Sequence, residues 1–310
     1  MGALGAMSEF ETPEPITLFV DVLVGDVRIA ASDRSNTVVE VRPSDPERRR
    51  DVTAAEQTRV EYSGGSLRVK TTRHWRSYSP FSDGGSVDVQ IELPTGSDVT
   101  GVAAVAALRS SGSLGDCRLK TSIGDIHIDE CAAVELKTST GNIDVERVIG
   151  NAEISTSTGA VRIGDVGGTA VIKNSNGDTR VGEVSGDLRV KAANGDIEID
   201  QAHASLAAKT ANGEIHIGSV TRGPVVAETG LGEVEIGIPD GTAAWLDLNT
   251  NFGQLHNALD TSRAPNAGEN SVEVRARTGY GDIAIRRSYA APSPDTRAER
   301  VSGSERGTAS

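Results

Sequence analysis

The sequence predicts an all-β fold, specifically a single-stranded β-helix (β-solenoid) with coils of about eighteen residues. Three observations support this: a glycine recurs at a nearly constant interval, aliphatic residues recur at fixed positions around it, and aromatic residues make up only 3 % of the chain. A fixed period of this length indicates a repeat architecture in which each unit packs on its neighbours. The repeated glycines are 17, 18, 18, 18, 18 and 19 residues apart: Gly124, Gly141, Gly159, Gly177, Gly195, Gly213 and Gly232.

Aliphatic residues stand two and four places after each of these turn glycines, and five and seven places before it. Spacing by two is typical of strands, whose alternate side chains point to one face. Each unit therefore reads as a strand, a glycine turn, a second strand and a second turn, with a short third side. Stacked units would place each column in one continuous core, and the most uniform column holds Ile128, Val145, Ile163, Val181, Ile199, Ile217 and Ile236.

Asparagine precedes three successive turn glycines, at Asn176, Asn194 and Asn212. Asn-Gly is a strong signal for a tight turn, because glycine tolerates positive φ. We expect these asparagine side chains to hydrogen-bond from coil to coil.

The flanking segments differ from the repeat in composition. We expect a disordered leader at 1–12, an N-terminal β segment and cap at 13–98, the regular solenoid at 99–240, C-terminal coils and cap at 241–287, and a disordered tail at 288–310. The N-terminal segment holds one helix candidate, Pro46 to Gln57, followed by a hairpin turning at Gly64 and Gly65.

Repeats such as KTSTGNIDV, VKAANGDIEI and AKTANGEIHI resemble those of the bacterial "putative adhesin" family of unknown function. The resemblance covers residues 16–287. It implies a right-handed single-stranded β-helix and supplies no catalytic residues to carry over.

Composition excludes several partners and folds. The net charge of −13 disfavours nucleic acid and anionic lipid, and no apolar run is long enough to span a membrane. Cys117 and Cys131 are too few for a disulfide framework and read as buried thiols. With no secretory signal at the start, we expect a cytoplasmic protein.

No pattern for a metal site, a cofactor or a catalytic centre stands out, so we predict none of these. His127 and His216 share an outward column but lie five coils apart, too far to share a metal. A column of Asp178, Asp196, Glu214 and Glu233 follows the turn glycines. It reads as charged surface balanced by a lysine column, with weak Ca²⁺ binding as the alternative.

Three aromatic residues gather in the loop His74–Gly85, interleaved with arginine. The loop either folds over the first coil as a lid or binds a partner, because aromatic residues and arginine are enriched at binding hot spots. The candidate partner-binding residues are Trp75, Arg76, Tyr78 and Phe81. The aromatic segment Trp245 to Phe252 reads as a terminal cap.

The resulting functional hypothesis is a non-catalytic intracellular binding or scaffold module that presents flat solenoid faces to an unidentified protein partner. Alternatives are a surface adhesin exported by a non-classical route and, less favoured, a carbohydrate-active β-helix enzyme. Capped ends and acidic repulsion predict a monomer or small oligomer rather than a filament.

Overall fold

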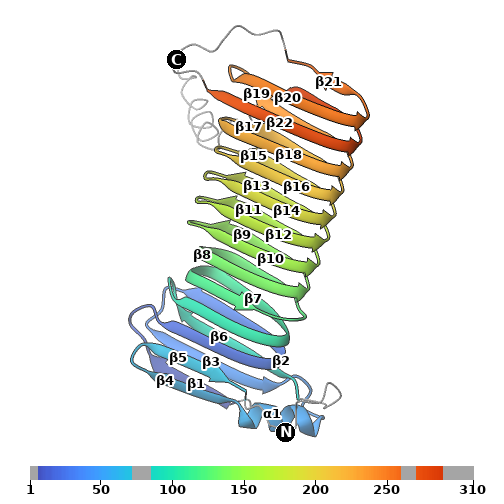
Figure 1. The fold of residues 1–310 in the computed structure, drawn as a ribbon. Helices are drawn as coiled ribbons and strands as arrows, with labels where there is room; N and C mark the ends of the chain where they lie inside the picture. The colour runs from blue at the N-terminus through green and yellow to red at the C-terminus, as the bar shows by residue number, and fades with distance from the viewer. Residues whose placement is uncertain (1–5, 72–84, 260–269, 289–310) are drawn as a thin grey trace, which may run out of the picture.

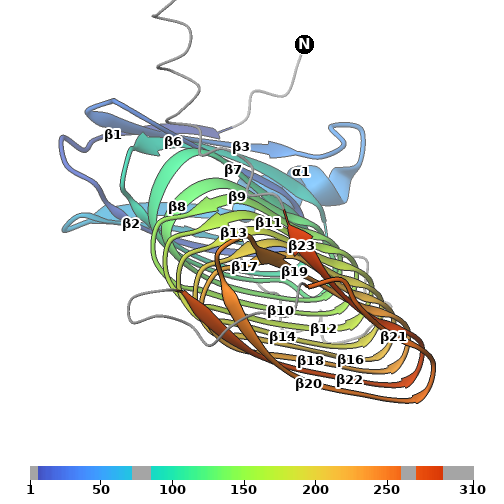
Figure 2. The ribbon, with the colours of Figure 1, turned by 90° about the horizontal axis from the view of Figure 1, so that it is seen from above.

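The computed structural model describes residues 6–71, 85–259 and 270–288 and shows a β-solenoid, which confirms the predicted fold class (Figure 1). Seen along its axis, the molecule is a stack of flattened coils (Figure 2). Successive coils are joined by parallel strand pairing in register, as in Ile154 opposite Ile172.

Two β faces run the length of the solenoid. Face A is formed by the strands before each turn glycine, and face B by the strands after it. The two long strands β7 (Asp98–Lys120) and β8 (Ile126–Thr140) contribute to both faces. Face A continues with β10 (Ala152–Thr158), β12 (Ala170–Asn176), β14 (Leu188–Asn194), β16 (Leu206–Asn212), β18 (Gly223–Leu231), β22 (Ser271–Tyr280) and β20 (Ala243–Phe252). Face B continues with β9 (Ile143–Val148), β11 (Val161–Val166), β13 (Thr179–Val184), β15 (Ile197–Ala202), β17 (Ile215–Val220), β19 (Val234–Pro239), β23 (Ile283–Ser288) and β21 (Leu255–Asn257).

The core is the set of aliphatic columns that the sequence predicts. Every member of the column four places after the turn glycine is at most 3 % exposed, from Ile128 to Ile236. Glu198 points outward next to Ile199, which is fully buried, so the predicted register is correct. Burying such columns in every coil supplies the hydrophobic stabilisation of a repeat fold.

The turn glycines are required by both conformation and space. Their φ angles lie between 127° and 150° from Gly124 to Gly232. A Cβ on Gly213 would lie 2.1 Å from the carbonyl oxygen of Gly195 in the coil below. The preceding asparagines form the expected ladder, since Nδ2 of Asn194 donates to Oδ1 of Asn176 at 2.8 Å and Asn212 donates to Asn194 at 2.7 Å.

A second polar ladder lies inside the turn, three places before each glycine. There a buried threonine donates its hydroxyl to the carbonyl of the turn glycine in the coil below, as Thr156 does to Gly141 at 3.3 Å and Thr229 to Gly213 at 2.9 Å. These bonds satisfy carbonyls that the tight turn leaves outside the strand ladders.

Two adjacent coils lack this threonine, and one of them compensates for the other. Ala192 stands at the position where a threonine hydroxyl would donate a hydrogen bond to the Gly177 carbonyl. In the coil below, the buried Asn174 donates to Gly159 at 3.0 Å and also to Gly177 at 2.8 Å. Its amide thus serves two carbonyls, while its own Oδ1 is buried without a partner.

At the N-terminal end the coil opens into antiparallel extensions. The long strand β2 (Thr17–Ser32) pairs with β7 on one side. Its other side pairs with β5 (Ser66–Lys70) and then with β6 (Val87–Pro94). Antiparallel strands follow outward: β4 (Arg59–Ser63) beside β5, and β3 (Asn36–Pro43) and then β1 (Ala6–Glu11) beside β6. Of the leader expected to be disordered at 1–12, residues 6–11 instead form a strand, because each of them pairs with a residue of β3.

The predicted helix forms as α1 (Arg49–Gln57), three residues shorter than expected at its start. Asp45 accepts a hydrogen bond from the Glu47 amide in a turn before the helix, instead of capping it. The buried Asp51 accepts a hydrogen bond from the Ser86 amide at 2.9 Å and so holds the helix against the β6 end.

At the C-terminal end the coils do not follow chain order. The coil of β22 and β23 lies between the coil of β18 and β19 and that of β20 and β21, so the segment nearest the chain end is an inner layer (Figure 1). The strand pair near Val272 to Ile285 is therefore the penultimate layer, and the aromatic segment from Trp245 to Phe252, expected as a terminal cap, belongs to the outermost coil. Of the tail expected at 288–310, Ser288 is the last residue of β23, and residues 289–310 lie outside the described residues.

Candidate functional site

The loop that was predicted from sequence as a lid or a partner-binding site supplied four candidate residues. Trp75, Arg76, Tyr78 and Phe81 all lie outside the described residues. The remaining candidate surfaces are therefore those of the solenoid itself.

The acidic column beside the turn glycines has a structural role. Oδ1 of Asp178 accepts a hydrogen bond from the backbone amide of Asp196, and Oδ1 of Asp196 accepts one from the amide of Glu214 at 2.8 Å. These two aspartates thus cap the next coil, as Asp125 does for Asn142. The described lysines do not balance this column: Lys137 and Lys209, for example, pair with Glu135 and Glu228 on face A.

Face A carries a shallow groove of about 330 Å³ near β8, β10 and β12, with Arg118, Glu135 and Glu153 in its lining. The hydrogen bond from Lys137 and its positive charge lower the pKa of Glu135. A carboxyl held in its ionised form is a poor general acid, so the groove lacks a property that glycoside cleavage would require of this residue.

Both cysteines are fully buried free thiols, as expected. A hydrogen bond with Cys131, together with burial, raises the pKa of the Cys117 thiol well above its ordinary value. A neutral buried thiol is a weak nucleophile, so this residue contributes to packing.

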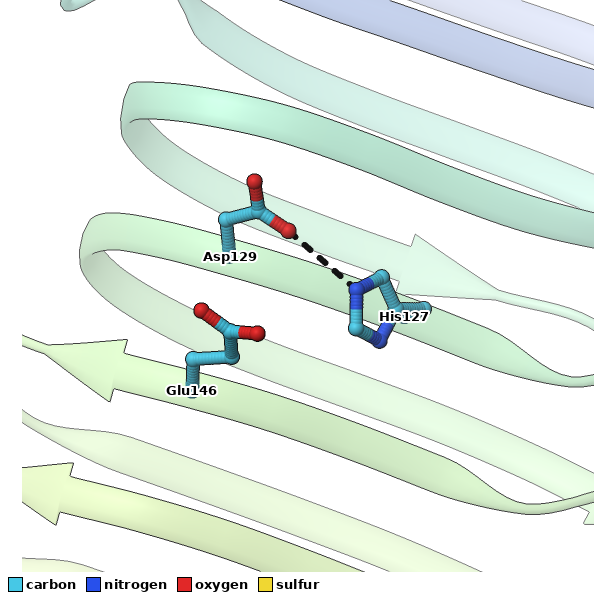
Figure 3. Close-up of side chains that lie close together, drawn as sticks. All are labelled: His127, Asp129 and Glu146. Carbon is cyan, nitrogen blue, oxygen red and sulfur yellow. Dashed lines mark hydrogen bonds and ion pairs between the residues drawn. The ribbon is translucent and has the colours of Figure 1, made fainter.

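Face B carries a mixed cluster that spans two coils (Figure 3). His127 and Asp129 project from β8, and Glu146 projects from β9 on the next coil. Nε2 of His127 lies 3.2 Å from Oδ1 of Asp129, and one ligand atom from each of the three residues lies within 4.8 Å of the other two. His127 and Asp129 are half-buried and Glu146 is exposed.

This cluster was not predicted from the sequence, where the histidines were compared only with one another. The repeat register contains the signal: Asp129 and Glu146 both stand five places after a turn glycine in adjacent coils, and His127 stands two places before Asp129. Residues at equal positions of adjacent coils lie about 4.8 Å apart, which is close enough to share a ligand.

A row of exposed apolar side chains lies at the glycine-turn edge of the last coils. Leu231, Tyr280 and Phe252 occupy the asparagine-ladder position in three stacked coils and are 50 %, 56 % and 63 % exposed. The rings of Tyr280 and Phe252 are stacked with centroids 4.7 Å apart. We call these three residues the apolar row.

The fold and these surfaces define a class of protein, the repeat β-solenoids. On the long faces of this solenoid, polar side chains pair with neighbours in the same coil or the next one. The model of the family described as Toastrack DUF4097 matches residues 17–286, and the chain belongs to this family.

Several solved structures are similar to the chain. A "putative adhesin" from Parabacteroides distasonis is 12 % identical, covers 90 % of this chain and 96 % of its own, and has a TM-score of 0.40. A "putative lipid binding protein" from the same species is 12 % identical, covers 92 % and 96 %, and has a TM-score of 0.33. A "putative adhesin" from Parabacteroides merdae is 11 % identical, covers 91 % and 95 %, and has a TM-score of 0.35.

A comparison with curated proteins found no match. Among the described residues, no helix has both the length and the apolar character needed to cross a membrane.

Proposed function

We propose that this chain is a non-catalytic binding module that acts inside the cell and contacts a protein partner through the last coils of its solenoid. The observation that carries the proposal is the apolar row of Leu231, Tyr280 and Phe252, exposed on a regular, hydrogen-bonded scaffold. Exposed aromatic residues grouped in this way are typical of protein-binding hot spots.

The surroundings of the apolar row indicate the chemistry of the partner. Glu233 and Asp282 lie one place beyond the turn glycines of two of these coils, and both carry negative charge toward solvent. A partner surface with apolar residues flanked by lysine or arginine would match both features. The rigid turn supports such binding, because side chains held by a solenoid lose little conformational entropy on association.

The two free thiols support the intracellular part of the proposal. Both are buried and unpaired in the core, as expected for a protein in a reducing compartment. Cell fractionation tests this part directly: recovery in the cytosol is expected. Recovery at the cell surface would overturn it and favour the adhesin alternative.

The binding surface is tested by capturing partners from a cytosolic extract with the wild-type chain and two variants. Tyr280→Ser combined with Phe252→Ser removes the stacked rings. Ile149→Ser is the matched control, because Ile149 is similarly exposed, at 60 %, but lies on a middle coil. A partner bound by the wild type and the control, and lost by the double variant, supports the proposal.

Binary titration with the purified partner then measures the loss, which we expect to be at least about tenfold in Kd for a hot-spot pair. Unchanged melting temperatures would show that the variants are folded. Equal capture by all three proteins would refute a role for the apolar row.

A further inference from the structure

We propose that His127, Asp129 and Glu146 form a binding site for a divalent transition-metal ion of the Zn²⁺ type. The site is independent of the protein-binding surface, since it lies on face B near the start of the regular coils (Figure 3). Three further observations carry the inference: the charge of the cluster, its place in the repeat and the geometry of its ligand atoms.

The first observation is uncompensated charge. Three other carboxylates on this face have an arginine partner within 3.2 Å, in the pairs Asp26–Arg109, Asp165–Arg147 and Glu198–Arg180. Within the described part of the chain, neither Asp129 nor Glu146 has an arginine or lysine partner. Two adjacent carboxylates without a counter-charge repel each other, and a bound cation would relieve that repulsion.

The neighbouring arginines are engaged elsewhere. Arg109 stands opposite His127 in the strand register, and its guanidinium contacts both oxygens of Asp26 at 3.1 Å. Arg147 follows Glu146 in sequence, but its Nη2 lies 3.2 Å from Asp165. Neither Arg109 nor Arg147 is therefore directed at the cluster.

The second observation is the place of these carboxylates in the repeat. The position five places after the turn glycine is itself glycine in four later coils: Gly164, Gly182, Gly218 and Gly237. A Cβ added to any of them would lie 1.9 to 2.7 Å from a carbonyl oxygen of the coil below. Asp129 and Glu146 thus place carboxylates in consecutive coils at a position that is glycine in most later coils. Asp129 also lies beside His127.

The third observation is geometry. Oδ2 of Asp129 accepts a hydrogen bond from the Gly112 amide at 3.2 Å, which orients the carboxylate and leaves Oδ1 directed at His127. An ion bound at about 2.1 Å needs ligand atoms about 3.0 to 3.5 Å apart. The His127–Asp129 pair already has this spacing, and the exposed Glu146 can approach by a side-chain rotation. One imidazole and two carboxylates suit Zn²⁺, Mn²⁺ or Ni²⁺, whereas Ca²⁺ prefers oxygen ligands alone.

The experiment is a calorimetric titration of the untagged, metal-stripped full chain with ZnCl₂, followed by the same titration of variants. We expect one site per chain in the wild type. His127→Gln and Glu146→Gln should each weaken its Kd at least about tenfold, as expected for the loss of one of three ligands. CaCl₂ at equal concentration should not compete.

His216→Gln is the matched control. His216 occupies the same repeat position as His127, with Nδ1 3.3 Å from Glu235, but Gly218 and Gly237 stand where the cluster has Asp129 and Glu146. This variant should bind Zn²⁺ within about twofold of the wild type, and Zn²⁺ should raise its melting temperature as in the wild type. No saturable binding by the wild type would overturn the proposal, as would equal loss in His127→Gln and His216→Gln.

Discussion

The double role of Asn174 makes a quantitative prediction. Asn174→Thr should keep the hydrogen bond to Gly159, because Thr156 makes the equivalent bond to Gly141. It should lose the bond to Gly177, which nothing else among the described residues replaces while position 192 is alanine. Adding Ala192→Thr should then supply the missing hydroxyl, as Thr210 does for Gly195.

The magnitude follows from the cost of a stranded acceptor. An unsatisfied buried carbonyl costs about 1 to 3 kcal/mol. Replacing Asn174 also removes its buried Oδ1, which has no hydrogen-bond partner. The free energy of unfolding of Asn174→Thr should therefore fall by only about 1 kcal/mol. The gain from losing this unsatisfied Oδ1 is the same in Asn174→Thr and in the double variant, so it cancels in a double-mutant cycle. Ala192→Thr should therefore stabilise the Asn174→Thr background by about 1 to 2 kcal/mol more than it stabilises the wild type.

The assay is urea unfolding of the full chain and the three variants, followed by far-UV circular dichroism and compared at one urea concentration. The four m-values should agree, which would show that the unfolding reactions are comparable. Additivity within about 0.5 kcal/mol would mean that positions 174 and 192 do not share the Gly177 carbonyl, and would refute the reasoning.

Two further substitutions test the register and the turn. Ile199→Asp should cost more than about 4 kcal/mol, because it buries an unpaired carboxylate, whereas Glu198→Ala removes one exposed ion pair with Arg180 and should cost less than about 1 kcal/mol. Equal losses of melting temperature would place the register one residue off. Gly213→Ala should be more destabilising than Gly64→Ala by at least about 1 kcal/mol in urea unfolding. Both glycines have positive φ, but an added Cβ would meet the carbonyl of Gly195 in the first case and open space in the second. Equal destabilisation would contradict a packing role for Gly213.

The regular coils were predictable because every unit repeats the same local information. The column of Ile199, the strand on each side of the turn glycine and the ladder of Asn194 all follow from spacing alone, and the structure confirms them. In a repeat fold, aligning the repeats in the sequence also gives the pairing of residues between adjacent coils, so residues at equal positions stack.

The features that were missed depend on contacts between units. The strand at residues 6–11 forms because β3 offers it a free edge, which local composition does not reveal. The compensation by Asn174 requires knowing which carbonyl each side chain reaches. The cluster of His127, Asp129 and Glu146 joins two coils, and reading the coils one at a time separated it.

The interleaved coils at the C-terminal end have a consequence for synthesis. The strands at 243–257 are made before those at 271–288, yet the later strands are their only neighbours among the described residues. On a growing chain, the outermost coil has no native surface to join until the segment that separates it from the rest has left the ribosome. The last coils of the solenoid can therefore assemble only after residues 271–288 have been made. A chain cut just before residue 270 would remove a strand partner from each of two coils, that of β18 and β19 and that of β20 and β21.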